Sequence, residues 1–285
     1  MGKVVLITGC SSGIGLETAI ACAKEGNTVF ATVRNMNNST ELKKRIENEQ
    51  LKNIEMLELD VAKTESIEVT ISSIVQKAEK IDVLFNNAGF MIMGSLEDLT
   101  RDEIESQINT DLLGAIYLTK NVIPHMKKSN PGLIINMSSI AGRVGWGLAT
   151  AYCVSKFGIE GFTDSLRREL MTRNINVCLI EAGIVHSKFF ENMRYAKASE
   201  KSEYAKETTQ MLAMVDAMKN LEGWTKPSDV AKEVLKIIEE NGEKVRYAIG
   251  NDAKAILEVV HMSRDNSQAM DEALAKIMKE YFPDL

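Results

Sequence analysis

The sequence predicts an α/β protein built on a single doubly wound, Rossmann-type parallel sheet of seven strands, with helices on both faces. Short β-branched runs alternate with helical patterns of about 12 to 20 residues, the length that a right-handed crossover between parallel strands needs. The strand runs are continuously apolar rather than alternating, which is typical of strands buried on both faces. No Gly/Ser-rich linker divides the 285 residues, so we expect one domain over 1–285.

The expected strands follow one another at regular intervals along the chain. The first four are 4–7, 29–33, 54–59 and 83–85, and the last three are 133–135, 177–180 and 245–249. A helix is expected to open near Pro227, where proline suits a first helical turn.

Two segments depart from the βα alternation. Residues 187–224 show no strand signal and are too long for an ordinary connection, and they carry Met193, Met211, Met214 and Met218. We expect them to form a lid over a substrate, although methionines at helical spacing also suit a plain core. Residues 252–285 lie beyond the last strand and are expected to form a C-terminal helical extension.

Composition excludes several classes of function. The net charge of −6 supplies no basic field for nucleic acid or for an anionic membrane. No apolar run approaches the length of a membrane span, and the N-terminal MGKVVLITG lacks the pattern of a signal peptide. The four cysteines form no CxxC pair, and the three histidines have no metal-ligand spacing. We therefore expect a cytoplasmic protein that binds no metal.

A glycine-rich turn follows the first expected strand. It reads Thr8-Gly9-Cys10-Ser11-Ser12-Gly13-Ile14-Gly15, and a helical pattern begins at once. Glycines allow close approach of the backbone to a pyrophosphate, which the free N–H groups of a helix N-terminus attract. A turn that merely starts a helix is the alternative. The position between strand and helix favours a binding role for Gly9, Ser11, Ser12, Gly13, Ile14 and Gly15.

With this turn, the chain resembles the short-chain dehydrogenase/reductase superfamily, whose cofactor turn is TGxxxGIG. Asn86-Asn87-Ala88-Gly89 is similar to the family's NNAG element, and Glu181 to Ser187 is similar to its PG segment, with Ala182 in place of proline. The segments TGCSSGIG, ATVRN and YCVSKFGIEGF look like the branch that contains 17β-hydroxysteroid and retinol dehydrogenases. The resemblance implies further cofactor contacts from Asp60, Val61, Asn87, Ala88, Gly89, Val185 and Ser187, and from Tyr152 and Lys156.

The resemblance also implies a catalytic set of Asn109, Ser139, Tyr152 and Lys156. Tyr152 and Lys156 are four residues apart in a helical pattern, which places them on one helix face. A free tyrosine has a pKa near 10, and a nearby ammonium lowers it toward the range of a useful base. An isolated YxxxK is usually a pair of surface residues, but this pair follows Ser139 at a strand end, where α/β sheets bind ligands.

The assignments of Ser139 and Asn109 each have an alternative. Ser139, rather than its neighbour Ser138, is expected to hydrogen-bond the substrate oxygen. Asn109 corresponds by resemblance to a water-holding link in a proton path to Lys156, and a buried amide that satisfies helix carbonyls is its alternative.

The end of the second strand indicates which nicotinamide cofactor is used. NAD-specific proteins place an acidic residue there, whereas this chain has Val33 followed by Arg34. A guanidinium suits a 2′-phosphate, so we expect NADP(H) rather than NAD(H). The alternative is an Arg34 that merely ends the strand on the surface.

The function that these observations favour is an NADP(H)-dependent oxidoreductase in which Tyr152 is the acid/base for a carbonyl/alcohol pair. The family branch suggests a bulky apolar small molecule as substrate. A catalytically silent NADP(H)-binding regulator and a sugar-nucleotide epimerase or dehydratase are the alternatives. The first is disfavoured by the intact Ser/Tyr/Lys set, and the second by the lack of a large C-terminal domain. By resemblance, helices near 102–127 and 151–173 are expected to pair in a homodimer or homotetramer.

Overall fold

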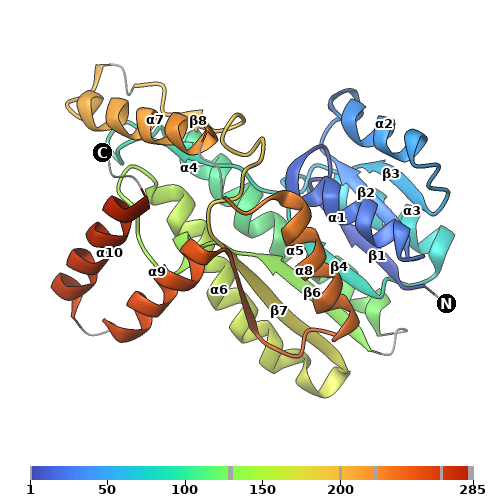
Figure 1. Ribbon diagram of the computed structural model, residues 1–285. Coiled ribbons are helices and arrows are strands. Elements are labelled where there is room, and N and C mark those ends of the chain that lie inside the picture. The colour runs from blue at the N-terminus through green and yellow to red at the C-terminus, as the bar shows by residue number, and fades with distance from the viewer. Residues whose placement is uncertain (1, 128–130, 199–200, 221–223, 264–265, 282–285) are drawn as a thin grey trace.

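The computed structural model describes residues 2–127, 131–198, 201–220, 224–263 and 266–281. Its centre is a seven-stranded sheet in the order β3-β2-β1-β4-β6-β7-β9, in which every neighbouring pair is parallel (Figure 1). The strands are β1 (Val4–Ile7), β2 (Thr28–Val33), β3 (Ile54–Glu58), β4 (Val83–Asn86), β6 (Gly132–Met137), β7 (Ile175–Ala182) and β9 (Arg246–Ile249). This architecture confirms the predicted fold class and all seven predicted strands.

The central strands are buried on both faces, as their continuous apolar sequences predicted. Every residue of β1 and β4 is buried, and only Asn176 in β7 and Thr28 in β2 are exposed. The strands at the two edges of the sheet, β3 and β9, are less enclosed. The order reverses direction between β1 and β4, and such a switch point is where open α/β sheets bind ligands.

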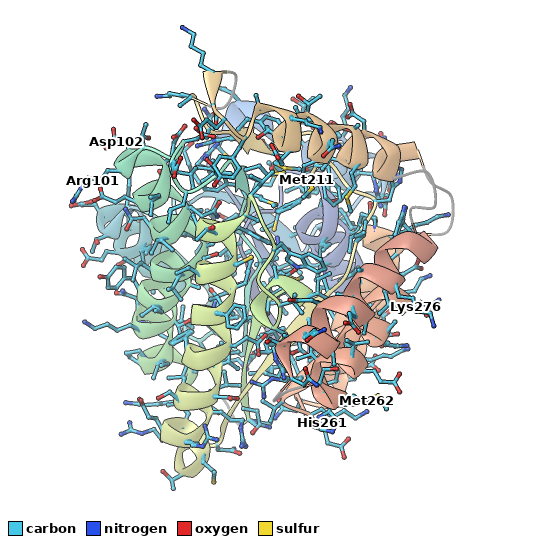
Figure 2. All side chains as sticks on the ribbon, turned by 90° about the vertical axis from the view of Figure 1, so that its left-hand side faces the viewer. Arg101, Asp102, Met211, His261, Met262 and Lys276 are labelled. Atoms are coloured by element: carbon cyan, nitrogen blue, oxygen red, sulfur yellow. The ribbon has the colours of Figure 1, made fainter. Side chains whose placement is uncertain are left out.

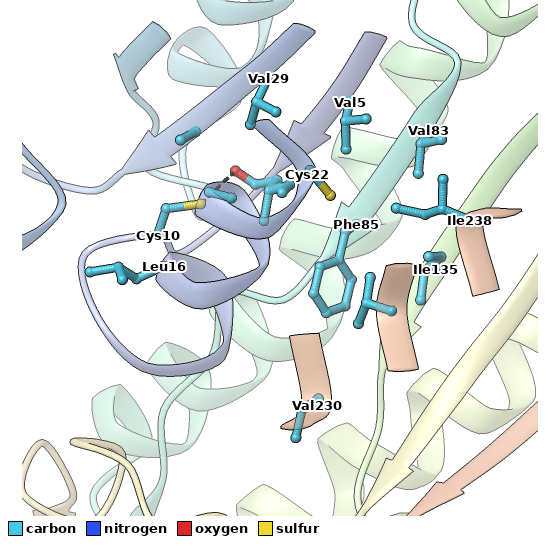
Figure 3. Close-up of a cluster of buried hydrophobic side chains, with 14 of the residues drawn as sticks. Val5, Cys10, Leu16, Cys22, Val29, Val83, Phe85, Ile135, Val230 and Ile238 are labelled. Atoms are coloured by element: carbon cyan, nitrogen blue, oxygen red, sulfur yellow. Dashed lines mark hydrogen bonds between the residues drawn. The ribbon is translucent and has the colours of Figure 1, made fainter. Parts of the chain in front are cut away.

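One face of the sheet is covered by three helices, namely α1 (Gly13–Lys24), α2 (Thr40–Asn48) and α8 (Pro227–Glu239). Figure 3 shows this core, in which Phe85 lies between the sheet and side chains such as Val230 of α8. Cys10 and Cys22 belong to the same cluster, and the Cys10 thiol donates a hydrogen bond to the Ile7 carbonyl. All four cysteines are buried free thiols.

The opposite face is covered by α3 (Thr64–Ala78), α5 (Gly114–Met126) and α6 (Thr150–Leu170). Its core cluster joins Leu6, Leu84 and Ile134 of the sheet to the apolar sides of these helices. Short α4 (Arg101–Ile108) runs into α5 through η2, a π-helical turn over Asn109–Leu113. With both faces covered, ligands reach the sheet only at the ends of its strands.

Beyond the sheet lie α7 (Ala205–Asn220), α9 (Asn251–Met262) and α10 (Ser267–Tyr281), with α9 and α10 side by side as a hairpin (Figure 1). The helices α9 and α10 lie in the region for which a C-terminal helical extension was predicted, whereas α7 lies in residues 187–224. Within the described residues, no helix combines the length and apolar character that crossing a membrane requires.

The absence of strands from residues 187–224 was a wrong prediction. Two-residue strands, β5 (Ile92–Met93) and β8 (Arg194–Tyr195), pair in parallel outside the main sheet. A two-residue strand has no periodicity of its own, so only its tertiary partner reveals it.

Candidate active site

A cavity of about 1210 Å³ opens at the carboxyl ends of the sheet strands. Because parallel strands all end at this edge, segments far apart in the chain converge there. The predicted residues that line the cavity are Gly9, Ser11, Ser12, Gly13, Ile14, Arg34, Asp60, Val61, Asn87, Ala88, Gly89, Ser139, Tyr152, Lys156, Val185 and Ser187. Of the predicted set, only Gly15 and Asn109 are not among its lining residues.

The glycine turn has the geometry of an anion cradle. Gly9 and Gly13 have φ of +73° and +62°, a left-handed conformation that favours glycine. A Cβ on Gly15 would lie 2.3 Å from the Gly9 carbonyl oxygen, so Gly15 packs the turn rather than lining the cavity. The Ser12 side chain does not cap α1, and the first turn of α1 contains no acidic residue. The first N–H groups of the helix therefore remain available for an anion.

Asn87 holds this turn against the neighbouring strand. Its Nδ2 donates to the carbonyl oxygens of Thr8 (2.8 Å) and Gly9 (3.2 Å), and the Thr8 hydroxyl accepts from the Asn87 N–H (3.0 Å). The Asn87 side chain thus holds the ends of β1 and β4 together, so its role in the site is structural.

One end of the cavity carries positive charge beside β2. Arg34 and Lys44 line it, together with the polar side chains of Asn37 and Thr40. The sequence had indicated Arg34 alone, since the others lie on α2 and its approach and are brought near only by folding. Across the cavity mouth, the Lys188 ammonium lies 2.6 Å from a carboxylate oxygen of Glu41.

The predicted reacting groups meet near the middle of the cavity. Ser139 caps a short helical turn directly after β6, and its hydroxyl accepts from the Ala141 N–H at 3.2 Å. Tyr152 and Lys156 lie on one face of α6 and are 9% and 4% exposed. The Lys156 Nζ is 5.4 Å from the centre of the Tyr152 ring and donates to the Met137 carbonyl at 3.1 Å.

The neighbouring Ser138 is engaged elsewhere. Its hydroxyl donates to the Glu160 carboxylate at 2.6 Å, and Glu160 in turn pairs with Arg246 at 3.0 Å. These contacts connect α6 to the edge strand β9. Ser139 is half-buried at the cavity and is the better placed of the two hydroxyls to meet a substrate.

The electrostatics around Tyr152 differ from the expectation of a simply lowered pKa. Burial raises the pKa of Tyr152, the Lys156 ammonium lowers it, and the Asp111 carboxylate raises it; a hydrogen bond with Ser139 also lowers it, and the net direction is upward. Lys156 acts as predicted, yet it is opposed by desolvation and by a carboxylate that the sequence reasoning did not single out.

The assignment of Asn109 as a member of this set is wrong. Asn109 is exposed, and Asp111, two residues later, contacts Lys156 with 3.3 Å between Oδ2 and Nζ. The physical reason is the π-helical turn, in which the Gly114 N–H bonds the Asn109 carbonyl, so the 3.6-residue periodicity does not hold there. Asp111 ahead of Leu112 and Leu113 was the available signal, because a carboxylate in an apolar run needs a buried partner.

The rest of the cavity is mainly apolar, with Arg194 and Asp252 among its polar lining residues, and it comes largely from segments outside the sheet. Met91 and Met93 line it from the β5 region, and aromatic and apolar side chains complete its walls. These are Trp146, Phe189, Phe190, Met193, Met211, Met214, Val215, Trp224, Ile256 and Ile277. Figure 2 shows α7, which carries Met211, crossing one end of the molecule above sulfur atoms, with α10 and its Lys276 beside it. The Met218 side chain lies outside the described residues.

Known proteins are similar to this chain in sequence and in fold. The family model for short chain dehydrogenases matches residues 3–198. Over 249 residues the chain is 31% identical to a 3-ketodihydrosphingosine reductase from Bacteroides thetaiotaomicron, covering 87% of this chain and 88% of the relative. Over 190 residues it is 37% identical to human retinol dehydrogenase 8, covering 66% and 60%. The crystal structure of a short-chain dehydrogenase from Streptomyces avermitilis superimposes with a TM-score of 0.80 at 25% identity, covering 98% and 99% of the two chains.

Proposed function

Because this chain belongs to the short-chain dehydrogenase family, whose members are oxidoreductases that interconvert alcohols and carbonyls with nicotinamide cofactors, we propose that it binds NADP(H) as its cofactor and uses Tyr152 in catalysis. In this proposal Tyr152 is the general acid/base, Ser139 hydrogen-bonds the reacting oxygen and Lys156 acts on the phenol. The observation that carries it is the meeting of these three side chains in one cavity with the glycine turn. A silent regulatory protein would need no such set.

The residues around the cavity fit a phosphorylated dinucleotide. The α1 N-terminus and the turn from Gly9 to Gly13 would hold the pyrophosphate, since they offer N–H groups without a competing acid. Arg34 and Lys44 would hold a 2′-phosphate, because both cations line the cavity beside the end of β2, where Val33 stands in place of a carboxylate. This charge pattern supports NADP(H) over NAD(H).

The bound cofactor would supply or accept the hydride, and the protein orients and polarises the substrate. In reduction the Tyr152 hydroxyl donates a proton to the substrate oxygen while the Ser139 hydroxyl stabilises the charge that develops there. In oxidation the phenolate accepts that proton, which the Lys156 ammonium favours electrostatically.

The apolar walls support a bulky, mainly hydrocarbon substrate. Methionine side chains adapt their shape to a ligand, and six of them line this cavity among the described residues, namely Met91, Met93, Met137, Met193, Met211 and Met214. Residues 187–224 act as a lid in this proposal, and the hairpin of α9 and α10 closes the far wall with Ile256 and Ile277. In this proposal the chain forms one domain over residues 1–285.

We also propose that α5 and α6 pair with those of a second copy in a homodimer or homotetramer. Tyr117, Val154 and Phe157 on these helices are 45%, 54% and 48% exposed, so they offer apolar surface that a second copy would cover. Sedimentation of a monomer at micromolar concentration would contradict this assembly. Buried free thiols support a reducing compartment such as the cytoplasm.

The decisive test is a panel of apolar ketones and secondary alcohols assayed with NADPH, NADH and their oxidised forms. We expect turnover with NADPH or NADP⁺, and a loss of about 10²- to 10⁴-fold in kcat for Tyr152→Phe with unchanged NADPH affinity. Tyr117→Phe is the matched control, because it removes a phenol hydroxyl from the outer face of α5 and should leave kcat unchanged. Turnover that survives Tyr152→Phe would refute the assignment.

A further inference from the structure

Asp111 is a carboxylate enclosed at the back of the active site. Its side chain is 0% exposed, and it lies in the π-helical turn between α4 and α5. Oδ1 accepts the Phe90 N–H at 3.2 Å, and the Gln107 side chain also hydrogen-bonds the carboxylate. Oδ2 has Lys156 as its charged partner at 3.3 Å. Burying a carboxylate costs several kcal/mol unless it is paired, so this one requires its lysine.

The site is also shaped around this carboxylate. A Cβ on Gly89 would lie 2.8 Å from Asp111 Oδ2, so a larger residue after Ala88 would displace the carboxylate from its present position. The Phe90 N–H that follows then points at Oδ1. The segment after β4 therefore contacts Asp111 with a small residue, Gly89, and with a backbone donor, the Phe90 N–H. Together with Lys156, these contacts fix the position of the carboxylate.

Lys156 thus interacts with two groups: it pairs with the Asp111 carboxylate, and it lowers the pKa of the Tyr152 phenol. Its ammonium nitrogen lies 3.3 Å from the Asp111 Oδ2 and 5.4 Å from the centre of the Tyr152 ring. The carboxylate cancels much of the field that the ammonium would exert on the phenol, because both charges lie in the same water-poor region. We propose that Asp111 is a positioning residue that keeps Lys156 charged and in place while weakening its pull on the Tyr152 hydroxyl.

The titratable groups around this pair are few. Tyr152 faces Lys156 and Cys153 of its own helix and Asp111 of η2, and Lys156 faces Asp111 and Tyr152. Arg194 and Asp252 line the same cavity from β8 and α9. Burial raises the pKa of Asp111 to about 6 against the lowering effect of Lys156. Burial lowers the pKa of Lys156, but Asp111 and Tyr152 more than offset it.

The sign of the effect on the phenol follows from these charges. Above about pH 6 the ionised carboxylate opposes phenolate formation, so Tyr152 stays protonated to higher pH than Lys156 alone would allow. A protonated phenol is the acid that carbonyl reduction needs. Removing the carboxylate charge should therefore lower the pKa of Tyr152 and favour the base that oxidation needs.

The test replaces the carboxylate by its isosteric amide, Asp111→Asn, and follows phenolate absorbance by ultraviolet difference titration against Tyr152→Phe in the NADP⁺ complex. We expect the titration midpoint of Tyr152 to fall by about one pH unit or more. Asp98→Asn is the matched control, because Asp98 is buried outside the cavity-lining residues, and its midpoint should equal that of the wild type. If Asp111→Asn does not fold, Asp111→Ser, which keeps an acceptor for Phe90, undergoes the same titration.

An unchanged midpoint would show a purely structural role and overturn the proposal. A raised midpoint would overturn it too, since it would mean that Lys156 loses its charge instead of acting more strongly. The inference rests on the proposed role of Tyr152, yet the titration requires no turnover, so its failure is distinguishable from failure of the substrate panel. Once a substrate is found, kcat/KM for oxidation can be measured as a function of pH. The pH at which kcat/KM rises should be lower in Asp111→Asn than in the wild type.

Discussion

The two halves of the active-site cavity are built in different ways. The cofactor half is made of backbone, with Gly9 and Gly13 in left-handed conformations and Asn87 bonded to two carbonyl oxygens of the turn. The substrate half is made of side chains. Methionine and phenylalanine come from β5, the loop after β7 and α7, tryptophan comes from the segments before α6 and α8, and isoleucine comes from the α9–α10 hairpin. The backbone geometry of the cofactor half can form in only one way, whereas many combinations of apolar side chains could fill the walls of the substrate half to a similar volume.

This contrast teaches where the protein is specific and where it adapts. At Gly9 and Gly15 the turn tolerates almost no added atom, because the nearest contacts are themselves backbone. Apolar walls tolerate exchange of one hydrocarbon for another as long as volume is conserved. Substitutions in the two halves should therefore differ both in size of effect and in which ligand they affect.

The largest effect on ligand binding is expected from Gly9→Ala. Its Cβ would lie 2.9 Å from the Ala88 Cα, and the φ of +73° would cost a further 1–2 kcal/mol, on the order expected for a left-handed side chain. Displacing the turn should weaken NADPH binding roughly 100-fold, as measured by fluorescence titration.

Gly26→Ala is the control for Gly9→Ala, because Gly26 has a φ of +78° and nothing within 4 Å of an added Cβ. It should lower the free energy of unfolding by a similar strain cost and leave NADPH affinity unchanged. Equal loss of affinity in both variants would show that strain alone, and not the crowded cradle, determines binding.

A smaller and more selective effect is expected from Arg34→Ala. Losing a charge-assisted contact to a 2′-phosphate should raise the Kd for NADPH about 10- to 30-fold and leave that for NADH nearly the same. Arg101→Ala, which removes an exposed arginine paired with Glu105 on α4, should change neither. If NADH and NADPH weaken together in Arg34→Ala, the residue does not discriminate between them.

The smallest effect is expected in the substrate half, from Met211→Ala. Removing part of one apolar wall should raise KM for a bulky ketone about fivefold and leave NADPH affinity unchanged, whereas Met211→Leu should be close to neutral. Met262→Ala, at a position 76% exposed at the end of α9, is the control. A change of NADPH affinity in Met211→Ala would break the separation of the two halves.

Much of the fold and of the cofactor half was predictable from local sequence. Apolar runs such as Val4 to Ile7 can only be buried strands, and the spacing of helices between them dictates parallel pairing. The glycines of the turn and the i,i+4 pair of Tyr152 and Lys156 carry their geometry in their own spacing. These features depend on contacts within a few residues of each other, so the sequence displays them.

Other features were decided by tertiary contacts. The carboxylate beside Lys156 is Asp111 and not an amide at Asn109, because a π-helical turn changes which side chain faces α6. The pairing of β5 with β8 and the convergence of Lys44 with Arg34 likewise join segments with no local signal.

The amino-acid order alone thus determined the sheet, the glycine-rich turn and the residue types of the proposed reacting set. Folding decided the charge balance at Tyr152 and the shape of the substrate half. The physical reason is the separation along the chain over which each effect acts. Dihedral preferences and helical spacing act between residues that are near one another in the sequence. Desolvation and the pairing of buried charges depend on whatever the fold brings within a few ångströms.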